Sequence, residues 1–136
     1  MKVLRSIYLK VLILFAVITI SGCTASPELG NYNLQLRNQM QDMIDVLFGG
    51  HYTEFMETYV DPDYIKNMGG VNQALRDFDN SEQQRLYADL KLCKNITPFY
   101  NENKKELTYT STVMQQPITF KQIGTKWYME GYWFKN

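Results

Sequence analysis

Residues 118–129 read Ile118-Thr119-Phe120-Lys121-Gln122-Ile123-Gly124-Thr125-Lys126-Trp127-Tyr128-Met129. Apolar and polar side chains alternate on both sides of Gly124-Thr125, and such alternation is typical of a strand with one buried face. A glycine-containing pair between two runs of this kind is typical of a hairpin turn. The stretch therefore predicts an antiparallel hairpin, and it is the clearest structural signal in the chain.

The turn sets the register of this hairpin. With Gly124-Thr125 as its central residues, the expected pairs are Ile123 with Lys126, Gln122 with Trp127, Phe120 with Met129 and Ile118 with Gly131. One face is then apolar and is formed by Ile118, Phe120, Trp127 and Met129. The opposite face carries Thr119, Lys121, Tyr128 and Glu130. A slip of one residue would mix the two sets, so the sequence specifies this register strongly.

Two further strands are expected upstream of the hairpin. Residues 90–99 and 107–114 read as strands, and the polar stretch 101–105 between them is typical of a turn. Together with the hairpin, these strands predict an antiparallel sheet in the C-terminal half.

The N-terminal half has the spacing of amphipathic helices. A first helix is expected over residues 33–48, where Gly49-Gly50 ends it. Its apolar face consists of Leu36, Met40, Met43, Ile44, Leu47 and Phe48. A second helix is expected up to Asp61-Pro62, because a residue before proline leaves the helical conformation. Its apolar side consists of Tyr52, Phe55, Met56 and Tyr59.

The segment after Asp61-Pro62 is expected to be less regular. Residues 63–68 read as a loop, and Gly69-Gly70 leads into a third, short helix with Val71, Ala74, Leu75 and Phe78 inward. Ser81-x-x-Gln84 is typical of a capping box and predicts a further turn of helix through Leu86 and Leu90.

The expected fold class is α+β, with a curved antiparallel sheet packed on two to three N-terminal amphipathic helices. Gly49-Gly50-His51-Tyr52-x-x-Phe55 after an amphipathic helix, together with the C-terminal hairpin, resembles the nuclear-transport-factor-2-like (SnoaL-like, cystatin-like) fold over about residues 33–131. That resemblance implies a cone-shaped domain with a pocket at its wide end. Some members of the fold are isomerases, dehydratases or cyclases, and many others only bind or dimerise. No catalytic motif of these enzymes matches here, so the resemblance implies the fold alone.

The N-terminus is typical of a secreted bacterial lipoprotein. Lys2, Arg5 and Lys10 carry all the charge of residues 1–22, and residues 11–20 form an uncharged, nearly all apolar run. This is the pattern of a secretory signal, and the run is short for a membrane-spanning helix. Ile20-Ser21-Gly22-Cys23 then resembles the bacterial lipobox. That resemblance implies cleavage after Gly22 and a lipid on the Cys23 thiol; an uncleaved anchor with an incidental cysteine is the alternative.

The lipobox divides the chain into a signal peptide (1–22), a lipidated tether (23–32) and a single α+β domain (33–136). The lipid on Cys23 makes a membrane the first expected partner and places the domain outside the inner membrane. Thr24 stands where an aspartate commonly retains lipoproteins at the inner membrane of Gram-negative cells. In such a host we therefore expect a position in the outer membrane, facing the periplasm.

Charge argues against a nucleic-acid partner. Three of the 14 basic residues precede Cys23 and none of the 14 acidic residues does, so the part from Cys23 onward carries a formal charge of −3. It has no cluster of lysines and arginines to contact phosphates. With Cys23 assigned to lipid, Cys93 is left as a lone cysteine, and its apolar neighbour Leu92 favours burial over reactivity.

A catalytic centre is not expected, and no cofactor or metal is expected. His51 is the single histidine, and its position at a helix start favours a neutral ring that caps backbone. Asp61-Pro62-Asp63 resembles a common turn more than a cation site. A carboxylate with a raised pKa could serve as an acid or base, but Asp77, Asp79 and Glu130 fall on solvated faces of the expected elements. Tyr109 could bind a ligand, although a place in the core is favoured.

The C-terminal aromatics are the candidate binding surface. Tyr132, Trp133 and Phe134 follow Gly131, where the sheet is expected to end, and exposed aromatics are enriched at protein interfaces. Packing on the domain itself is the alternative. The leading hypothesis is a membrane-anchored, non-catalytic binding or accessory lipoprotein, with a protein partner or a homodimer formed through the sheet or these aromatics. An envelope-tethered inhibitor or immunity protein and a SnoaL-like pocket enzyme are the other hypotheses.

Overall fold

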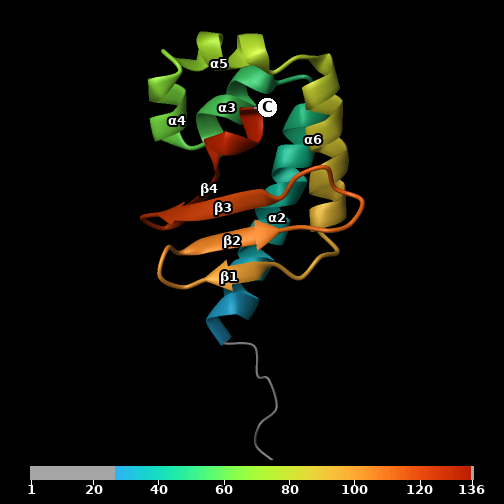
Figure 1. The fold of residues 1–136 in the computed structure, drawn as a ribbon, viewed down its shortest axis with the longest axis vertical. Coiled ribbons are helices and arrows are strands. Elements are labelled where there is room, and N and C mark those ends of the chain that lie inside the picture. Colours follow the sequence, from blue (N-terminus) through green and yellow to red (C-terminus); the bar gives the residue numbers. More distant parts are fainter. Residues whose placement is uncertain (1–26, 136) are drawn as a thin grey trace, which may run out of the picture.

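An antiparallel sheet with the strand order β1-β2-β3-β4 forms one layer of the fold (Figure 1). The computed structural model describes residues 27–135. The strands are β1 (Phe99–Asn101), β2 (Glu106–Tyr109), β3 (Ile118–Ile123) and β4 (Lys126–Met129). Helices α2 (Pro27–Phe48), α3 (Tyr52–Tyr59), α4 (Pro62–Asn67), α5 (Val71–Asp77) and α6 (Asn80–Cys93) precede the sheet, and a 3₁₀ helix, η1 (Gly131–Phe134), follows it. The predicted α+β class is confirmed, whereas the described residues form five α-helices instead of two to three.

The C-terminal hairpin has the predicted register. Phe120 pairs with Met129, Gln122 with Trp127 and Ile123 with Lys126. The predicted apolar face is buried, since Ile118, Phe120, Trp127 and Met129 all belong to the core. The predicted pair of Ile118 with Gly131 does not form, because β4 ends at Met129 and Gly131 is the first residue of η1.

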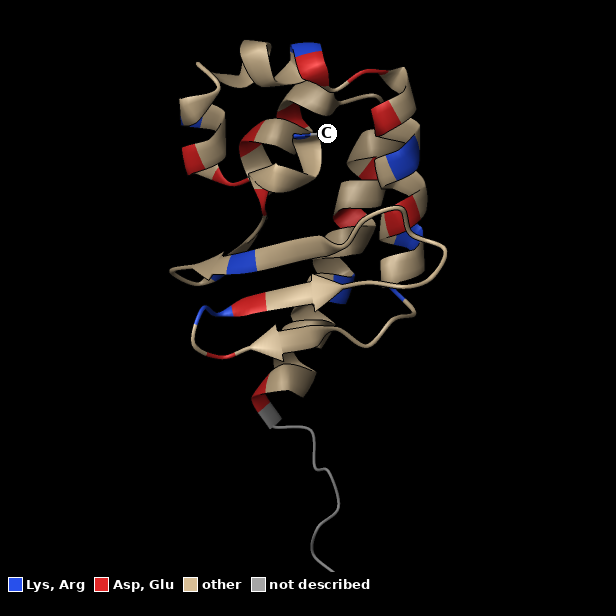
Figure 2. Ribbon diagram, viewed as in Figure 1, with Lys and Arg blue, Asp and Glu red and all other residues tan. Residues whose placement is uncertain are grey.

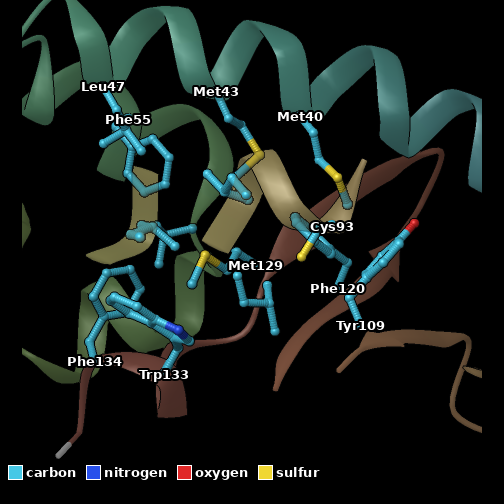
Figure 3. Packing of buried hydrophobic residues seen from close by; sticks show 14 of the residues in the cluster. Met40, Met43, Leu47, Phe55, Cys93, Tyr109, Phe120, Met129, Trp133 and Phe134 are labelled. Carbon is cyan, nitrogen blue, oxygen red and sulfur yellow. The ribbon is translucent and has the colours of Figure 1, made fainter. Parts of the chain in front are cut away.

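The core lies between the sheet, α2 and α6 and continues among α3, α4, α5 and η1, and the close view shows α2 side chains directed toward β3 (Figure 3). Methionines are prominent in it: Met40, Met43, Met56, Met114 and Met129 are all buried. Flexible thioether side chains fill irregular gaps between elements of different shape. Cys93 is also buried, as predicted, and burial raises the pKa of its thiol to about 12.

Helix α2 begins earlier than predicted. Its first residue is Pro27, so residues 27–32, expected as the end of the tether, are helical. Proline is favoured in the first turn of a helix, where its missing N–H costs nothing, and Glu28 places a negative charge at the positive end of the helix dipole. Leu29 and Tyr32 then pack against the core.

The predicted loop over residues 63–68 is wrong, because this segment forms α4. Asp61 is the N-cap residue, and its carboxylate accepts a hydrogen bond of 3.0 Å from the backbone N–H of Asp63. Pro62 supplies the fixed backbone angle that suits the first helical position. Tyr64 anchors the helix by entering the core.

The predicted strand over residues 90–99 is also wrong, because α6 continues to Cys93 and β1 starts only at Phe99. Leu86, Leu90 and Cys93 are buried at the spacing of a helix. The cap differs too: Asp79, and not Ser81, accepts the N–H of Glu82 at 3.0 Å. Strand β2 ends at Tyr109, five residues before the predicted end at Met114.

Candidate functional site

A recess of about 360 Å³ lies between α4, η1 and the end of β4. Its lining residues are Asp61, Asp63, Tyr64, Asn67, Met68, Glu130, Gly131, Tyr132 and Lys135. Four of them, Asp61, Asp63, Glu130 and Tyr132, were candidates from the sequence, and they come from two stretches far apart in the chain. Figure 1 shows that α4 and the C-terminal η1 both lie beyond the β4 side of the sheet, and this placement brings the two stretches together.

Backbone contacts hold the two stretches together. Val60 forms an isolated parallel bridge with Met129, and the N–H of Asp61 donates to the carbonyl of Met129 at 2.9 Å. One step further along, the backbone of Gly131 lies directly on the Tyr64 side chain. A methyl carbon added at Gly131 would lie 2.5 Å from Tyr64 Cβ and closer still to its ring. Glycine is therefore required at this crossing.

Replacing Gly131 tests this close approach. Gly131→Ala is expected to lower the free energy of unfolding by about 1–3 kcal/mol, because inserting a carbon into a well-packed site forces neighbouring atoms to move. Gly30→Ala on α2 is the matched control, since no heavy atom lies within 4 Å of its added carbon and alanine favours a helix. Denaturant unfolding of both variants measures the difference. A Gly131→Ala variant as stable as Gly30→Ala would contradict the described packing.

Asp61 has a structural role in this recess. Its Oδ2 lies 2.6 Å from Lys121 Nζ, and its Oδ1 caps α4. The hydrogen bond to Asp61 raises the pKa of Lys121, so this lysine stays charged. Asp61-Pro62-Asp63 is therefore the start of α4 and not the turn that the sequence predicted. Residues 27–135 contain no group of three or more histidine, cysteine or acidic side chains arranged to hold a metal ion.

Glu130 does not lie on a fully solvated face as predicted. It is half-buried, and burial raises the pKa of its carboxyl group, with the neighbouring Glu106 raising it further. Lys121 opposes this shift but already forms an ion pair with Asp61. Figure 2 shows acidic segments before α4 and after β4, with the basic segment of β3 nearby. Three carboxylates, those of Asp61, Asp63 and Glu130, therefore line the recess against one lining lysine, Lys135. Asp77 and Asp79, by contrast, are exposed as predicted.

A chain of hydroxyl groups links Tyr132, which lines the recess, to two strands of the sheet. Tyr132 donates a hydrogen bond of 2.6 Å to Thr119 Oγ1, which is 2.8 Å from Thr108 Oγ1 on the neighbouring strand. The Tyr132 side chain is still 44 % exposed. The hydroxyl of Tyr132 is thus anchored to the sheet while the residue stays partly exposed at the recess.

Trp133 and Phe134 are not a free binding surface, because both are buried in the core. The Phe134 ring stacks on Tyr64 with centroids 5.6 Å apart, and it meets Phe78 edge-on at 5.4 Å. The guanidinium of Arg85 covers the Trp133 ring at 4.5 Å. Of the three predicted interface aromatics, only Tyr132 is accessible in the folded chain.

The structure also places His51 and Tyr109, which were candidates from the sequence. His51 is exposed, and its side chain makes no capping hydrogen bond, contrary to the prediction, because its ring lies against Gly49. Tyr109 is fully buried as favoured, and its hydroxyl donates to Asn33 Oδ1 at 3.0 Å.

Sequence reasoning missed Lys121 and Glu106 as site residues. Glu106 and Lys121 pair across β2 and β3, and their position on the same polar face is the feature from which they could have been predicted.

The raised pKa of Glu130 predicts a pH dependence of stability. In the unfolded chain this carboxyl group ionises at its ordinary pKa, whereas in the folded chain its pKa is higher. The free energy of unfolding therefore falls as the pH rises from the unfolded-state pKa through the folded-state pKa. Glu130→Gln removes this loss, and we expect a higher melting temperature than wild type at pH 7 but little difference at pH 4. Thermal unfolding between pH 4 and pH 7 checks this expectation, with Glu57→Gln, at an exposed position of α3, as the control. A lower melting temperature of Glu130→Gln at pH 7 would contradict the electrostatic assignment.

In comparisons with known proteins, the chain matches no family model, no curated protein and no solved structure. Across residues 27–135, no helix combines the length and apolar character that crossing a membrane requires. The functional argument therefore rests on the chain's own residues.

Proposed function

We propose that this chain is a lipid-anchored envelope protein whose domain binds a partner without catalysis. The lipobox-like Ile20-Ser21-Gly22-Cys23 behind a basic, apolar leader supports the anchor, and it lies outside the described residues. Cys23 would carry the lipid, and in a Gram-negative host the protein would sit in the outer membrane and face the periplasm. The domain would then meet partners in the envelope.

The recess is the proposed binding site, and the partially buried Glu130 is the observation that carries this proposal. A carboxylate with little compensating charge favours a cation, and a lysine or arginine of a partner would supply both charge and hydrogen-bond donors. Tyr132 offers an aromatic face beside it, over which a cation can also be stabilised. The proposed partner is therefore a protein segment with an exposed basic side chain.

The cystatin-like form of the fold also remains a proposal. An antiparallel sheet packed on a long N-terminal helix supports it. The interior of such a cone is the place where an enzyme of this kind would bind its substrate. Here Met40, Tyr109 and Phe120 fill the space between α2 and the sheet (Figure 3). This packing favours the recess over the interior as the place where a ligand meets the domain.

Site-specific photo-crosslinking in cells tests this binding function. A photoreactive amino acid at position 132 is expected to crosslink a partner, and adding Glu130→Lys should abolish the product, because a like charge in the recess repels the basic side chain. The same probe at Phe48, which is 81 % exposed on α2, is the control position. A crosslink at position 132 that persists with Glu130→Lys would contradict the proposed recognition. A captured toxin or hydrolase would identify an inhibitor or immunity protein, and a captured second copy would identify a homodimer.

A further inference from the structure

One end of the domain exposes apolar side chains close to the proposed lipid. We define this end, the anchor-proximal end, as residues 27–34 of α2, strand β1 and the turn at residues 101–105. Figure 1 shows β1 beside the first turns of α2, and the rings of Tyr32 and Tyr100 lie 5.7 Å apart across this contact. Leu34 is 61 % exposed and Phe99 is 69 % exposed. Both belong to this end, and neither belongs to the core.

The length of chain before α2 limits how far this end can lie from the lipid. Four Cα–Cα steps separate Cys23 from Pro27, and at 3.8 Å for each step they span at most about 15 Å. Helix α2 starts at Pro27, so the domain follows the anchor without a long linker. If Cys23 carries lipid, the anchor-proximal end is within reach of the bilayer surface, and the far end of α2 lies about 30 Å further along the helix axis.

We propose that the anchor-proximal end docks on the bilayer surface, with Phe99 and Leu34 at the membrane interface. This inference rests on the proposed lipidation of Cys23. Aromatic and aliphatic side chains partition favourably into the boundary between headgroups and acyl chains. A single weak contact of this kind suffices because the lipid keeps the domain at high effective concentration near the surface.

Charge at this end adds little to the docking. Lys104 and Lys105 are exposed in the turn between β1 and β2, and lysines near an anionic leaflet are attracted to it. Glu28 and Glu102 are exposed at the same end and oppose that attraction. We therefore infer that the apolar side chains determine the docking and that it persists when salt screens the lysines.

Docking in this manner would orient the recess. Because β1 and β4 are the two edges of the sheet, the recess beside β4 lies three strand spacings, or about 15 Å, from β1. With β1 against the lipid, the mouth of the recess stays clear of the headgroups. A protein partner could then reach Glu130 and Tyr132 while the domain is bound to the membrane.

Fluorescence quenching by lipids tests the docking. The full lipidated chain is reconstituted into vesicles of phosphatidylethanolamine and phosphatidylglycerol, with and without brominated acyl chains, and floated on a density gradient. The variant Phe99→Trp adds an exposed indole at the docking end, whereas the native Trp127 and Trp133 are buried. We expect brominated lipid to quench most of the added emission. Phe48→Trp, at the far end of α2, is the matched control and is expected to keep its emission.

Each outcome separates the docking from the lipid anchor. Flotation with vesicles but no quenching of Phe99→Trp would overturn the docking and leave the anchor intact. Equal quenching of Phe99→Trp and Phe48→Trp would also overturn it, because the domain would then have no preferred end. A chain that does not float would overturn the lipidation and the docking together. If the emission of Phe99→Trp shifts with protein concentration and not with lipid, the docking is overturned. The anchor-proximal end would then be a contact between two copies of the chain.

Discussion

Deletion of residues 132–136 is expected to abolish stable folding of the domain. This segment contributes two buried aromatic side chains, Trp133 and Phe134. Truncating one such side chain costs about 3–5 kcal/mol, and small domains are stable by only about 5–15 kcal/mol in total. The loss extends beyond the deleted residues, because Tyr64 and Phe78 lose the Phe134 ring against which they pack.

Thermal unfolding of the chain from Thr24 onward measures this effect. Removing residues 135–136 alone is the matched control, because Lys135 is exposed and its deletion removes no core side chain. We expect the shorter deletion to unfold cooperatively near the wild-type temperature and the longer one to lack a cooperative transition. A near-wild-type melting temperature for the longer deletion would mean that Trp133 and Phe134 do not stabilise the domain.

Replacing Cys23 is expected to abolish lipid labelling of the protein. Cys23→Ala removes the thiol that would receive the diacylglyceryl group. Metabolic labelling with palmitate should mark the wild type and not this variant.

Cys93→Ala is the matched control for this experiment. Cys93 is buried in the folded domain and its thiol has a raised pKa, so its replacement should leave labelling unchanged. Equal labelling of wild type and Cys23→Ala would show that the lipobox interpretation is wrong. In a host with two membranes, fractionation of the wild type with the inner membrane would contradict the predicted outer-membrane position.

The sequence predicted the local elements well where periodicity and turn chemistry agreed. The hairpin around Gly124-Thr125 has its predicted register because a glycine turn and alternating side chains point to the same pairing. The helices α3 and α5 also lie where apolar spacing placed them. In these segments each residue's own preference matches the structure that it adopts.

The errors arose where two signals compete over a short segment. Leu90 and Cys93 are consistent with a strand when read alone, but the helix that starts at Asp79-Asn80 continues through them because Leu86 and Leu90 share a buried face. The loop predicted after Asp61-Pro62 is a helix because an aspartate cap and a proline favour helix initiation as much as they favour a turn.

The recess was beyond sequence reasoning for a different reason. Asp61 and Glu130 were each weighed separately, and they lie in one site only because Val60 bridges Met129. No local pattern encodes a single parallel bridge between distant segments. The burial that raises the pKa of Glu130 follows from that same contact and could not be anticipated from a strand position alone.

The methionines of the core make loss of structure difficult to reverse under oxidising conditions. While the domain is folded, Met40, Met43, Met56, Met114 and Met129 are shielded from solvent. Once the chain opens, peroxide or hypochlorous acid can convert the exposed thioethers to sulfoxides, which are polar and chiral. A sulfoxide cannot return to an apolar core without leaving its oxygen unpaired there. A chain that is oxidised while unfolded therefore does not refold. The lifetime of the protein under oxidising conditions then depends on its unfolding rate.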